Sequence, residues 1–575
     1  MDSINSFKGY GKVKEAEEQA FRKKTRRRLT IIVVSVIILV MIIVGAAVGS
    51  VIHKKNSSSD GSKPSTSAPV DSLKAVCSVT QYPDSCLTSI ASIESSSDKA
   101  DPEELFKLSL KVAIDELSKI STLPDRLAAG TTDQRLKLAL ADCKTMFEDA
   151  IDELNTSLSS MLPGKGEKLL SDAKLADIRT WISTAATDQD TCLDGLAEFS
   201  QELRIQMEKE IRNSTQFTSN SLAIATKIMT ILEKLNVPIH RKLLSVGFPG
   251  WVSSKDRKLL QEAKPTPDVT VAKDGTGQFK TIAEAVASVP KKNEKRYVIY
   301  VKEGVYVENV IIDKSKWNVM MYGDGQDKTI VSGSKNVVDG TPTFSTATVA
   351  AVGRNFIAKD MSFKNTAGPK KHQAVALRAG SDRSVFFQCS FDAFQDTLYA
   401  HSNRQFYRNC DITGTIDFIF GNAAAIFQDC TIRPRQPDTN QLNTITAQGK
   451  NDPNQNTGIS IQQCQITAFD NLTAPTYLGR PWRPYSTTII MQSGISNIVH
   501  PAGWLSWISN TVPPKTIFYA EYENTGPGSN VANRVTWPGY NPAVTENQAL
   551  RFTVNSFIQG SEWLPETGVL YGASL

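Results

Sequence analysis

VFFQCSF at residues 385–391 recurs as FYRNCDI at 406–412, IFQDCTI at 426–432 and SIQQCQI at 460–466. Each copy is a short apolar run that leads into a cysteine and continues with an apolar residue two positions later. Strand-like units that recur every twenty or so residues are typical of a solenoid of stacked parallel strands. The repeat therefore predicts that the C-terminal half is all-β and forms a right-handed parallel β-helix.

Two aspartates occupy equivalent places in consecutive turns of this repeat. Asp396 lies seven residues after Cys389, and Asp417 lies seven residues after Cys410. Stacked parallel strands lie about 4.8 Å apart, so we expect one carboxyl group directly above the other on the outside of the solenoid. Two carboxylates at such a distance do not both ionise readily, which suits acid–base or nucleophilic catalysis.

The charge of the chain is unevenly distributed. Residues 71–240 contain 18 Lys+Arg and 27 Asp+Glu, a net −9, whereas residues 263–575 contain 29 and 25, a net +4. This asymmetry predicts either that the two halves dock or that the partner is a polyanion. Nucleic acid is a poor candidate for that partner, because the C-terminal half has no basic stripe interleaved with aromatic residues and no known binding motif.

A candidate membrane anchor lies near the N-terminus. Residues 29–52 are continuously apolar or small, which is long enough to cross a bilayer. Six basic residues precede this run, and His53, Lys54 and Lys55 follow it; the preceding residues are Arg22, Lys23, Lys24, Arg26, Arg27 and Arg28. The positive-inside rule then places residues 1–28 in the cytosol and the rest of the chain in the lumen. We predict a signal anchor, with a cleaved signal peptide as the alternative.

Passage through the lumen agrees with other features of the sequence. Four N-glycosylation sequons occur, at Asn56, Asn155, Asn213 and Asn471. The same compartment permits disulfides among the eight cysteines of the chain. We therefore expect a membrane-anchored precursor in the secretory pathway.

A Ser/Pro/Gly-rich linker at residues 53–70 leads into a helical region at 71–236. Apolar residues recur there at intervals of three and four, from Leu136 to Leu158 and again from Ile224 to Leu235. Proline and glycine at Pro124, Pro163 and Gly164 separate these segments. The pattern predicts an all-α, antiparallel four-helix bundle.

This helical region contains four cysteines of its own. Cys77 and Cys86 are close enough in sequence to staple an N-terminal hairpin, and Cys143 and Cys192 could then join two helices of the bundle. The sequence alone does not fix this connectivity.

A connector at residues 237–262 contains two copies of one basic tetrapeptide, Arg241-Lys242-Leu243-Leu244 and Arg257-Lys258-Leu259-Leu260. An exposed basic motif between two domains is a suitable site for a processing protease. Ordinary solvated linker charge is the alternative interpretation.

From residue 268 onward, short runs rich in Val, Ile, Tyr and Phe replace the helical pattern. The spacing between these strands is too short for intervening helices except at residues 281–289, where we expect a helix that caps the solenoid. The glycine-rich KDGTGQF at 273–279 superficially resembles a phosphate loop, but we interpret it as the turn into that helix.

The residue types in the C-terminal half restrict its chemistry. The chain contains no G-x-S-x-G elbow, P-loop or H-E-x-x-H motif and only five histidines, which disfavours a Ser-His-Asp hydrolase and a His-rich metal site. A set of acids, amides, Arg and Trp remains: Gln373, Gln395, Asp396, Asp417, Arg480 and Trp482. Hydrogen-bonded ladders, and simple packing for Trp482, are the alternative roles.

The neighbours of Asp417 favour a functional role. Ile416, Phe418, Ile419 and Phe420 surround it in sequence. Burying an unpaired carboxylate costs several kcal/mol, so a cation must lie beside it, and Arg480 is the obvious candidate. We expect Arg480 to keep Asp417 ionised, whereas the adjacent like charge and the aromatic surroundings should raise the pKa of Asp396.

Five strings identify a family resemblance: YVIYVKEGVYVE, NTAGPKKHQAVALR, FDAFQDTLYAH, ITGTIDFIFGNAAAIFQDC and YLGRPWRPYSTTIIMQS. In this order they resemble the successive signatures of plant pectinesterases (pectin methylesterases). The resemblance covers about residues 265–575 and implies a catalytic β-helix at 263–575. Residues 71–236 resemble the pectinesterase/invertase inhibitor domain that forms a pro-region in many such enzymes.

The resemblance implies roles for individual residues in the hydrolysis of pectin methyl esters. Asp417 would be the nucleophile, and Asp396 the general acid and then the base. Gln395 and Gln373 would donate hydrogen bonds to the oxyanion. Arg480 would orient Asp417, Trp482 would bind the sugar face, and Thr343 is a further candidate for substrate binding. No metal or cofactor is required.

Cys410 and Cys430 occupy neighbouring rungs, whose spacing falls within the Cα range for a disulfide, and the resemblance also favours this pair. Cys389 and Cys464 would then be buried thiols. Four aromatic residues could either line the cleft or pack in the core: Phe394, Tyr399, Phe418 and Trp504.

The leading hypothesis is a monomeric esterase of the cell wall that acts on pectin, and whose acidic bundle covers the solenoid until a protease cuts the RKLL connector. Separate pectinesterase inhibitors are further candidate partners. A pectate lyase or polygalacturonase could use the same solenoid. In a third hypothesis the bundle inhibits other esterases and the solenoid is inert.

Overall fold

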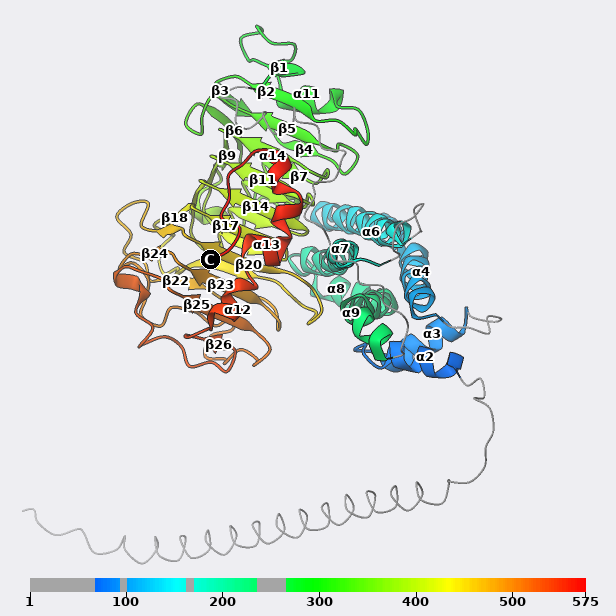
Figure 1. The fold of residues 1–575 in the computed structure, drawn as a ribbon. Coiled ribbons are helices and arrows are strands. Elements are labelled where there is room, and N and C mark those ends of the chain that lie inside the picture. Colours follow the sequence, from blue (N-terminus) through cyan, green and yellow to red (C-terminus); the bar gives the residue numbers. More distant parts are fainter. Residues whose placement is uncertain (1–67, 94–100, 162–169, 235–264) are drawn as a thin grey trace, which may run out of the picture. The chain divides into compact units, whose positions relative to one another are not determined.

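The computed structural model describes residues 68–93, 101–161, 170–234 and 265–575, all within one compact unit, Ala68–Leu575 (Figure 1). The predicted cytosolic segment, the predicted anchor at 29–52, Asn56 and both RKLL copies lie outside the described residues. Within the described ranges, no helix has the length and apolar character needed to span a membrane.

The N-terminal region is all-α, as predicted, but it contains more than four helices. Its four long helices are α4 (Pro102–Ile120), α6 (Gln134–Ser160), α7 (Asp172–Ala197) and α9 (Arg212–Lys234). Four short ones are also described between residues 68 and 234: α2 (Ala68–Cys77), α3 (Pro83–Ala91), α5 (Leu123–Ala129) and α8 (Gln201–Glu210). The short helices were missed in the sequence because seven to ten residues are too few to establish a 3.6-residue period.

Helix boundaries in this region follow local chemistry. The side chains of Asp101, Asp133, Ser171 and Ser200 accept hydrogen bonds from the first-turn N–H groups of α4, α6, α7 and α8. Pro124, which we interpreted as a break, instead occupies the first turn of α5. Proline is tolerated there because the N–H it lacks would have no partner within the helix.

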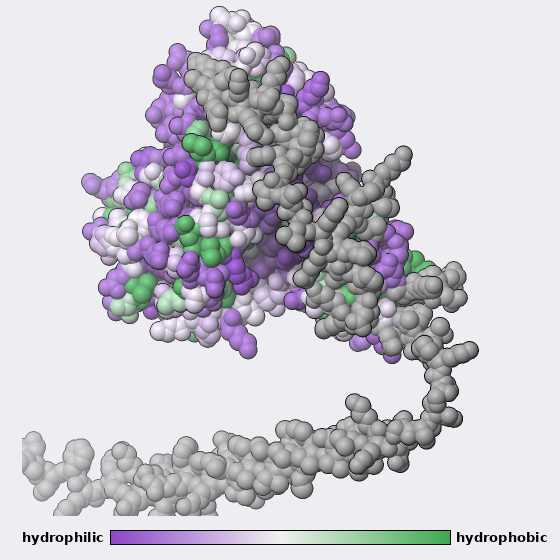
Figure 2. Space-filling view, in the orientation of Figure 1, coloured by the Kyte–Doolittle hydropathy of each residue, from purple (hydrophilic) through white to green (hydrophobic). Residues whose placement is uncertain are grey.

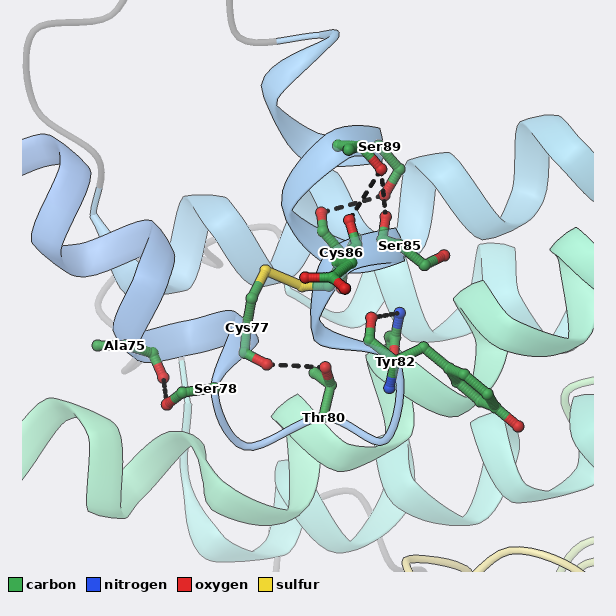
Figure 3. Close-up of a disulfide and its surroundings, with 12 residues drawn as sticks. Ala75, Cys77, Ser78, Thr80, Tyr82, Ser85, Cys86 and Ser89 are labelled. Atoms are coloured by element: carbon green, nitrogen blue, oxygen red, sulfur yellow. Dashed lines mark hydrogen bonds between the residues drawn. A yellow bond between two sulfur atoms is a disulfide. The ribbon is translucent and has the colours of Figure 1, made fainter. Parts of the chain in front are cut away.

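Two disulfides cross-link the helical region. Cys77 at the end of α2 bonds to Cys86 in α3, with a Cα–Cα distance of 5.6 Å (Figure 3). In the short turn between them, the hydroxyl of Thr80 donates to the carbonyl of Cys77 (Figure 3). Cys143 of α6 bonds to Cys192 of α7. Both pairings agree with the connectivity that the sequence suggested.

The C-terminal region is a parallel β-helix, as predicted (Figure 1). Residues 265–575 form three parallel sheets of eleven, eight and seven strands, here called sheets A, B and C. Sheet A consists of β1 (Val269–Val271), β2 (Tyr297–Val301), β5 (Val319–Tyr322), β8 (Ile357–Lys359), β11 (Ser384–Phe387), β14 (Arg404–Arg408), β17 (Ala424–Gln428), β20 (Gly458–Gln462), β23 (Thr487–Met491), β25 (Phe518–Tyr522) and β26 (Tyr540–Asn541).

Sheets B and C complete each rung. Sheet B consists of β3 (Gly304–Val307), β6 (Thr329–Gly333), β9 (Ser362–Asn365), β12 (Ser390–Asp392), β15 (Asp411–Gly414), β18 (Thr431–Pro434), β21 (Gln465–Ile466) and β24 (Gly494–Ile495). Sheet C consists of β4 (Val310–Ile312), β7 (Val349–Ala351), β10 (Leu377–Ala379), β13 (Leu398–Ala400), β16 (Ile419–Gly421), β19 (Asn443–Gln448) and β22 (Thr476–Gly479). The interior between the sheets is one continuous apolar core.

The repeated cysteine motif marks the turn from sheet A to sheet B. The residue before each cysteine has a positive φ: 54° at Gln388, 53° at Asn409, 52° at Asp429 and 56° at Gln463. Left-handed backbone is disfavoured for branched apolar residues and better tolerated by Asn and Asp. This turn explains why a polar residue interrupts the apolar run just before the cysteine enters the core.

The predicted Cys410–Cys430 disulfide is wrong. Both are free thiols, as are Cys389 and Cys464, and all four are buried. The sulfur of Cys410 lies 3.3 Å from the carbonyl oxygen of Phe386, and that of Cys430 lies 3.6 Å from the carbonyl oxygen of Tyr407. Equivalent side chains stack in parallel from rung to rung and donate to strand carbonyls, so rung spacing alone does not create a bond.

Helices cover parts of the solenoid. The predicted capping helix is α11 (Ile282–Ser288), where Thr281 and Glu284 form a capping box and Ile282 is buried in the core. Near the C-terminus lie α12 (Glu546–Leu550), α13 (Val554–Ile558) and α14 (Leu564–Thr567), drawn in red (Figure 1). Residues of α13 and α14 pack on the outer face of sheet A. The visible solenoid surface is mainly hydrophilic, with small, separate hydrophobic patches (Figure 2).

Candidate active site

A cleft of about 380 Å³ lies over the outer face of sheet C. Its lining from the solenoid contains every residue that the sequence predicted for catalysis or substrate binding: Thr343, Gln373, Gln395, Asp396, Asp417, Arg480 and Trp482. Phe344, Tyr399, Phe420, Ala447 and Trp507 complete that side, and residues of α7 line the other. On the solenoid side alone, the structure therefore brings together residues that are up to 164 positions apart in the sequence.

Asp396 and Asp417 occupy equivalent positions on neighbouring rungs. Leu398 and Ile419, each two residues further on, are paired in the sheet, and the N–H of Asp396 donates to the carbonyl of Ile416 at 3.0 Å. Both aspartates have left-handed backbone, with φ of 62° and 52°. The rung spacing of about 4.8 Å separates their backbones. The predicted stacking of the two acids is confirmed.

Asp417 is held by a bidentate ion pair. Arg480 Nε lies 2.8 Å from Asp417 Oδ1, and Arg480 Nη2 lies 2.6 Å from Oδ2. The hydroxyl of Thr444 donates to Oδ1 at 2.5 Å and lies 2.9 Å from the N–H of Asp417. Charge-assisted, two-point contacts of this kind fix the orientation of a carboxylate. The predicted Arg480–Asp417 contact is therefore present.

Asp396 has a different environment, although it lies only one rung away. Its side chain is 7% exposed. Burial raises the pKa of Asp396 well above its usual value, and the charges of Asp417 and Glu198 raise it further, whereas Arg480 acts in the opposite direction. The two carboxyl groups thus have different environments: that of Asp396 favours its protonated form, whereas Asp417 has a bidentate guanidinium partner.

Aromatic rings form a platform in the cleft. Tyr399 and Phe420 stack with ring centroids 4.2 Å apart, and Trp482 and Trp507 stack at 6.2 Å. The ring of Trp507 also lies 4.3 Å from the guanidinium carbon of Arg480. This arrangement offers apolar ring faces beside the two acids, as sugar binding requires.

The aromatic residues whose roles were open in the sequence divide between cleft and core. Tyr399 lines the cleft, whereas Phe418 and Trp504 are core residues with 0% and 1% exposure. Phe394 belongs to neither the cleft lining nor the core. Its ring centroid lies 4.1 Å from the guanidinium carbon of Arg435.

Among the residues that were missed in the sequence, three have direct contacts with predicted site residues: Thr444, Trp507 and Glu198. Thr444 is the counterpart of Asp417 on the next rung, since Ile419 pairs with Thr446. Trp507 belongs to an irregular segment with no repeat to place it. Glu198 comes from the end of α7 and accepts a hydrogen bond from the N–H of Thr343 at 3.0 Å. Continuing the rung register would have identified Thr444, but no sequence signal placed the other two.

Helix α7 and the residue that follows it place two acids, Asp194 and Glu198, in the lining of the cleft. Glu198 lies among the cleft residues, where burial raises its pKa to about 7. Asp194 forms an ion pair with Arg483, next to Trp482. On the neighbouring helix α6, Asp142 accepts a hydrogen bond from Ser345 at 2.7 Å. In this structure, therefore, residues of the helical region cover the cleft, and two of them, Asp194 and Glu198, are acidic.

Three of the four sequons lie within the described residues. Asn155, Asn213 and Asn471 are all exposed at the surface, as a glycan requires. Their modification remains a prediction.

Comparisons with known proteins identify both regions. The pectinesterase family model matches residues 268–561, and the plant invertase/pectin methylesterase inhibitor model matches residues 71–224. The chain is 58% identical over 587 aligned positions to pectinesterase 3 of Phaseolus vulgaris, with 100% of both chains covered. It is 57% identical to pectinesterase 1 of Arabidopsis thaliana, with 99% of both chains covered.

A solved structure supports the same assignment. The pectin methylesterase from carrot is 52% identical and superposes with a TM-score of 0.53, covering 55% of this chain and 100% of that chain. The matched family model, the full-length relatives and the β-helix agree. The chain therefore belongs to the pectinesterase family of carboxylic ester hydrolases and has an N-terminal region of the plant invertase/pectin methylesterase inhibitor family.

Proposed function

We propose that the cleft hydrolyses the C6 methyl esters of homogalacturonan, with Asp417 as the nucleophile and Asp396 as the acid and base. The observation that carries this assignment is the contrast between the two acids: Asp417 is paired with Arg480, whereas burial and like charges raise the pKa of Asp396. An esterase that uses two carboxyl groups needs this difference.

In the first half of the reaction, a carboxylate oxygen of Asp417 attacks the ester carbonyl carbon. The resulting oxyanion receives hydrogen bonds from the side-chain amides of Gln373 and Gln395, which line the same cleft. The tetrahedral intermediate then collapses, and the bond to the methoxy oxygen breaks. Asp396 transfers its proton to that oxygen, so methanol leaves and a mixed anhydride joins Asp417 to the sugar.

In the second half, the ionised Asp396 takes a proton from water. The hydroxide that forms attacks the anhydride, Asp417 departs as a carboxylate, and the sugar keeps a carboxyl group that ionises in solvent. Asp396 is protonated again and Asp417 is free, so the cycle closes without a metal or another cofactor. Arg480 orients Asp417 throughout, while Trp482 and Trp507 bind sugar faces.

The assignment is tested by Asp417→Asn in the chain after removal of the bundle. Loss of the nucleophile should lower the rate of methanol release by about 10⁴-fold or more. Asp411→Asn is the matched control, because Asp411 pairs with Arg433 on sheet B, away from the cleft. If the Asp417→Asn variant released methanol at the rate of the control, Asp417 would be removed from the mechanism.

The helical region is proposed to inhibit the cleft from within the same chain. Thr191, Asp194 and Glu198, in or just after α7, occupy the cleft lining, where a substrate chain would have to lie. The precursor would be anchored by residues 29–52 in the secretory pathway, and cleavage at an RKLL motif would release the mature enzyme to the cell wall.

Two preparations of one protein test this inhibition. The whole chain and the chain cut within residues 237–262 should differ by at least about tenfold in methanol release from the same pectin, because the covered cleft cannot admit the polysaccharide. N-terminal sequencing of the form extracted from the wall identifies the motif that is cut. Equal activity of the cut and uncut chains would contradict the inhibitory role.

A further inference from the structure

An exposed aromatic ring lies next to one of the three described sequons. Phe469 comes two residues before Asn471, in the sequence FDNLT at 469–473. The side chain of Phe469 is 41% exposed, and it lies outside the residues that line the catalytic cleft. A single exposed apolar side chain is common at protein surfaces, so the surroundings of this ring decide whether it has a role.

The ring of Phe469 ends a column of stacked groups on the outer face of sheet B. The guanidinium carbon of Arg435 lies 4.1 Å from the ring centroid of Phe394 and 4.8 Å from that of Phe469. Arg433 also lies over the Phe469 ring, at 5.1 Å. The N–H of Phe469 donates to the carbonyl of Pro434 at 3.0 Å, so both guanidiniums come from the preceding rung. The exposed part of the ring therefore lies on the side away from them.

The turn that contains Asn471 is clamped to the same preceding rung. The carboxylate of Asp470 accepts a hydrogen bond from the N–H of Gln436 at 3.0 Å. The side-chain oxygen of Gln436 accepts from the N–H of Thr473 at 2.9 Å and from its hydroxyl at 3.2 Å. The N–H of Leu472 donates to the carbonyl of Asp470 at 2.7 Å, which makes a tight turn with Asn471 at its apex. Asn471 is therefore held at a fixed position beside the exposed ring.

The other two described sequons have different surroundings. Asn155 lies in α6, where its Nδ2 donates to the carbonyl of Ile151 at 2.9 Å. Asn213 lies in α9, where its Nδ2 donates to a carboxylate oxygen of Glu116 at 3.1 Å. Neither has an aromatic residue two positions earlier. Asn471 lies outside the helices, and among the described residues no hydrogen bond of its Nδ2 is found.

We propose that Asn471 carries an N-linked glycan and that its first sugar, an N-acetylglucosamine, stacks on the ring of Phe469. In the secretory pathway, the amide nitrogen of Asn471 forms a bond to C1 of this sugar and loses a proton, and the diphosphate of a lipid-linked oligosaccharide donor leaves. The apolar C–H face of the sugar then covers the exposed side of the ring. Arg433 and Arg435 hold the ring from its other side.

The position of the turn gives this stacking a consequence for the enzyme. Asn471 lies between β21 of sheet B and β22 of sheet C. A glycan attached there could extend over either sheet, and the catalytic cleft lies over sheet C. Because Phe469 is on the sheet B side of the turn, a glycan that stacks on it leaves the cleft open to the polysaccharide.

Occupancy of the sequon is the first test. The whole chain is expressed in plant cells, and tryptic glycopeptides of the secreted protein are analysed by mass spectrometry. We expect a glycan on Asn471, and Asn471→Gln should lower the mass of the chain by one glycan. A secreted chain that carries no glycan on Asn471 would overturn the proposal.

The rate at which a peptide N-glycosidase releases the glycan from the native chain measures the stacking. A stacked sugar must leave the ring before the amidase reaches its linkage, so Phe469→Ala should accelerate release about two- to tenfold, the scale of one aromatic pair. Phe469→Trp keeps a ring and should release like the parent chain. Phe394→Ala, which removes the ring on the other side of Arg435, is the matched control and should also release like the parent. Equal rates for Phe469→Ala and the parent chain would contradict the stacking.

A spectroscopic readout separates stacking from a change in folding. After the glycan is trimmed to its first sugar, NMR follows the N-acetyl methyl group, whose proton resonance moves upfield when the sugar lies over an aromatic ring. We expect this upfield shift in the parent chain and its loss in Phe469→Ala, with the backbone amide resonances outside the turn unchanged. A methyl resonance that is the same in both chains would overturn the platform role of Phe469.

Discussion

The solenoid and the helical bundle encode their structures differently. In the solenoid, each rung repeats the same turn, so one motif such as VFFQCSF fixes strand, turn and core position at once. In the bundle, apolar spacing fixes only that a helix exists, and tertiary packing and two disulfides determine the rest. The periodic region thus supplies reactive groups at a set spacing, whereas the irregular region supplies a cover that can be removed.

The largest difference between the two regions should be in the unfolding free energy that is lost when a cysteine is replaced. Cys143→Ser opens a 49-residue loop between α6 and α7, and the chain-entropy model gives about 4 kcal/mol for such a cross-link. Cys410→Ser replaces a buried free thiol of the solenoid and should cost about 1–2 kcal/mol. Urea unfolding of the cut and separated regions measures both values. A larger cost for Cys410→Ser would reverse the comparison.

The second difference concerns one glutamine from each region. Gln395→Ala in the solenoid should lower kcat about 10²- to 10³-fold, because one donor to the oxyanion is lost. Gln189→Ala removes a buried bundle glutamine that bonds to Ser214 and Thr218, and should leave kcat of the cut enzyme unchanged. Steady-state rates of methanol release give kcat for both variants. An unaltered kcat for Gln395→Ala would exclude that residue from the site.

The third prediction concerns the contact between the two regions, whose strength should depend on pH. Burial raises the pKa of Asp142 to about 6 and those of Glu153, Asp190 and Glu198 to about 7. Because the docked form favours the protonated acids, docking is strongest below about pH 4 and weakens as the pH rises through these values. The bundle should therefore dissociate from the cut solenoid at least about tenfold more readily at about pH 7.5 than at about pH 4.5.

Sedimentation of the cut but unseparated chain measures that dissociation. Ion pairs such as Arg483–Asp194 favour the ionised acids and act in the opposite direction. Tighter association at the higher pH would show that these pairs dominate and would contradict the prediction.

The smallest effect is expected for Glu198→Gln, which should change the pKa of Asp396 and the pH dependence of docking. The amide keeps an acceptor for the N–H of Thr343 but removes a charge that raises the pKa of Asp396. We expect the pKa of Asp396 in the uncut chain to fall, and the pH dependence of docking to flatten by a few-fold. Asp125→Asn, an exposed change in α5, is the control. An unchanged pKa of Asp396 would indicate that Glu198 does not reach it electrostatically.

The solenoid and most of the site could be predicted from the sequence because the rungs around Cys389 and Cys410 have equal lengths. Counting from the cysteine fails where the rung length changes. Pro434 ends β18 and Asn443 begins β19, so the inserted residues move Thr444 away from the position seven residues after Cys430. The hydroxyl that binds Asp417 was missed for this reason.

The remaining omissions have other physical causes. Trp507 lies in an irregular segment, so no period relates it to Arg480. Glu198 reaches the cleft only through packing between helices and solenoid, which no local pattern records. The predicted Cys410–Cys430 disulfide was wrong because the spacing of two rungs does not determine the direction in which their side chains point.

The proton state of Asp396 tests the assignment of nucleophile and acid most directly. Carbon-13 NMR of its carboxyl group, assigned with Asp396→Asn, follows its titration in the cut and separated enzyme. We expect Asp396 to keep its proton to a higher pH than a solvent-exposed aspartate does, because burial and the charge of Asp417 raise its pKa. Loss of that proton at or below the ordinary pKa of an aspartate would contradict the assignment.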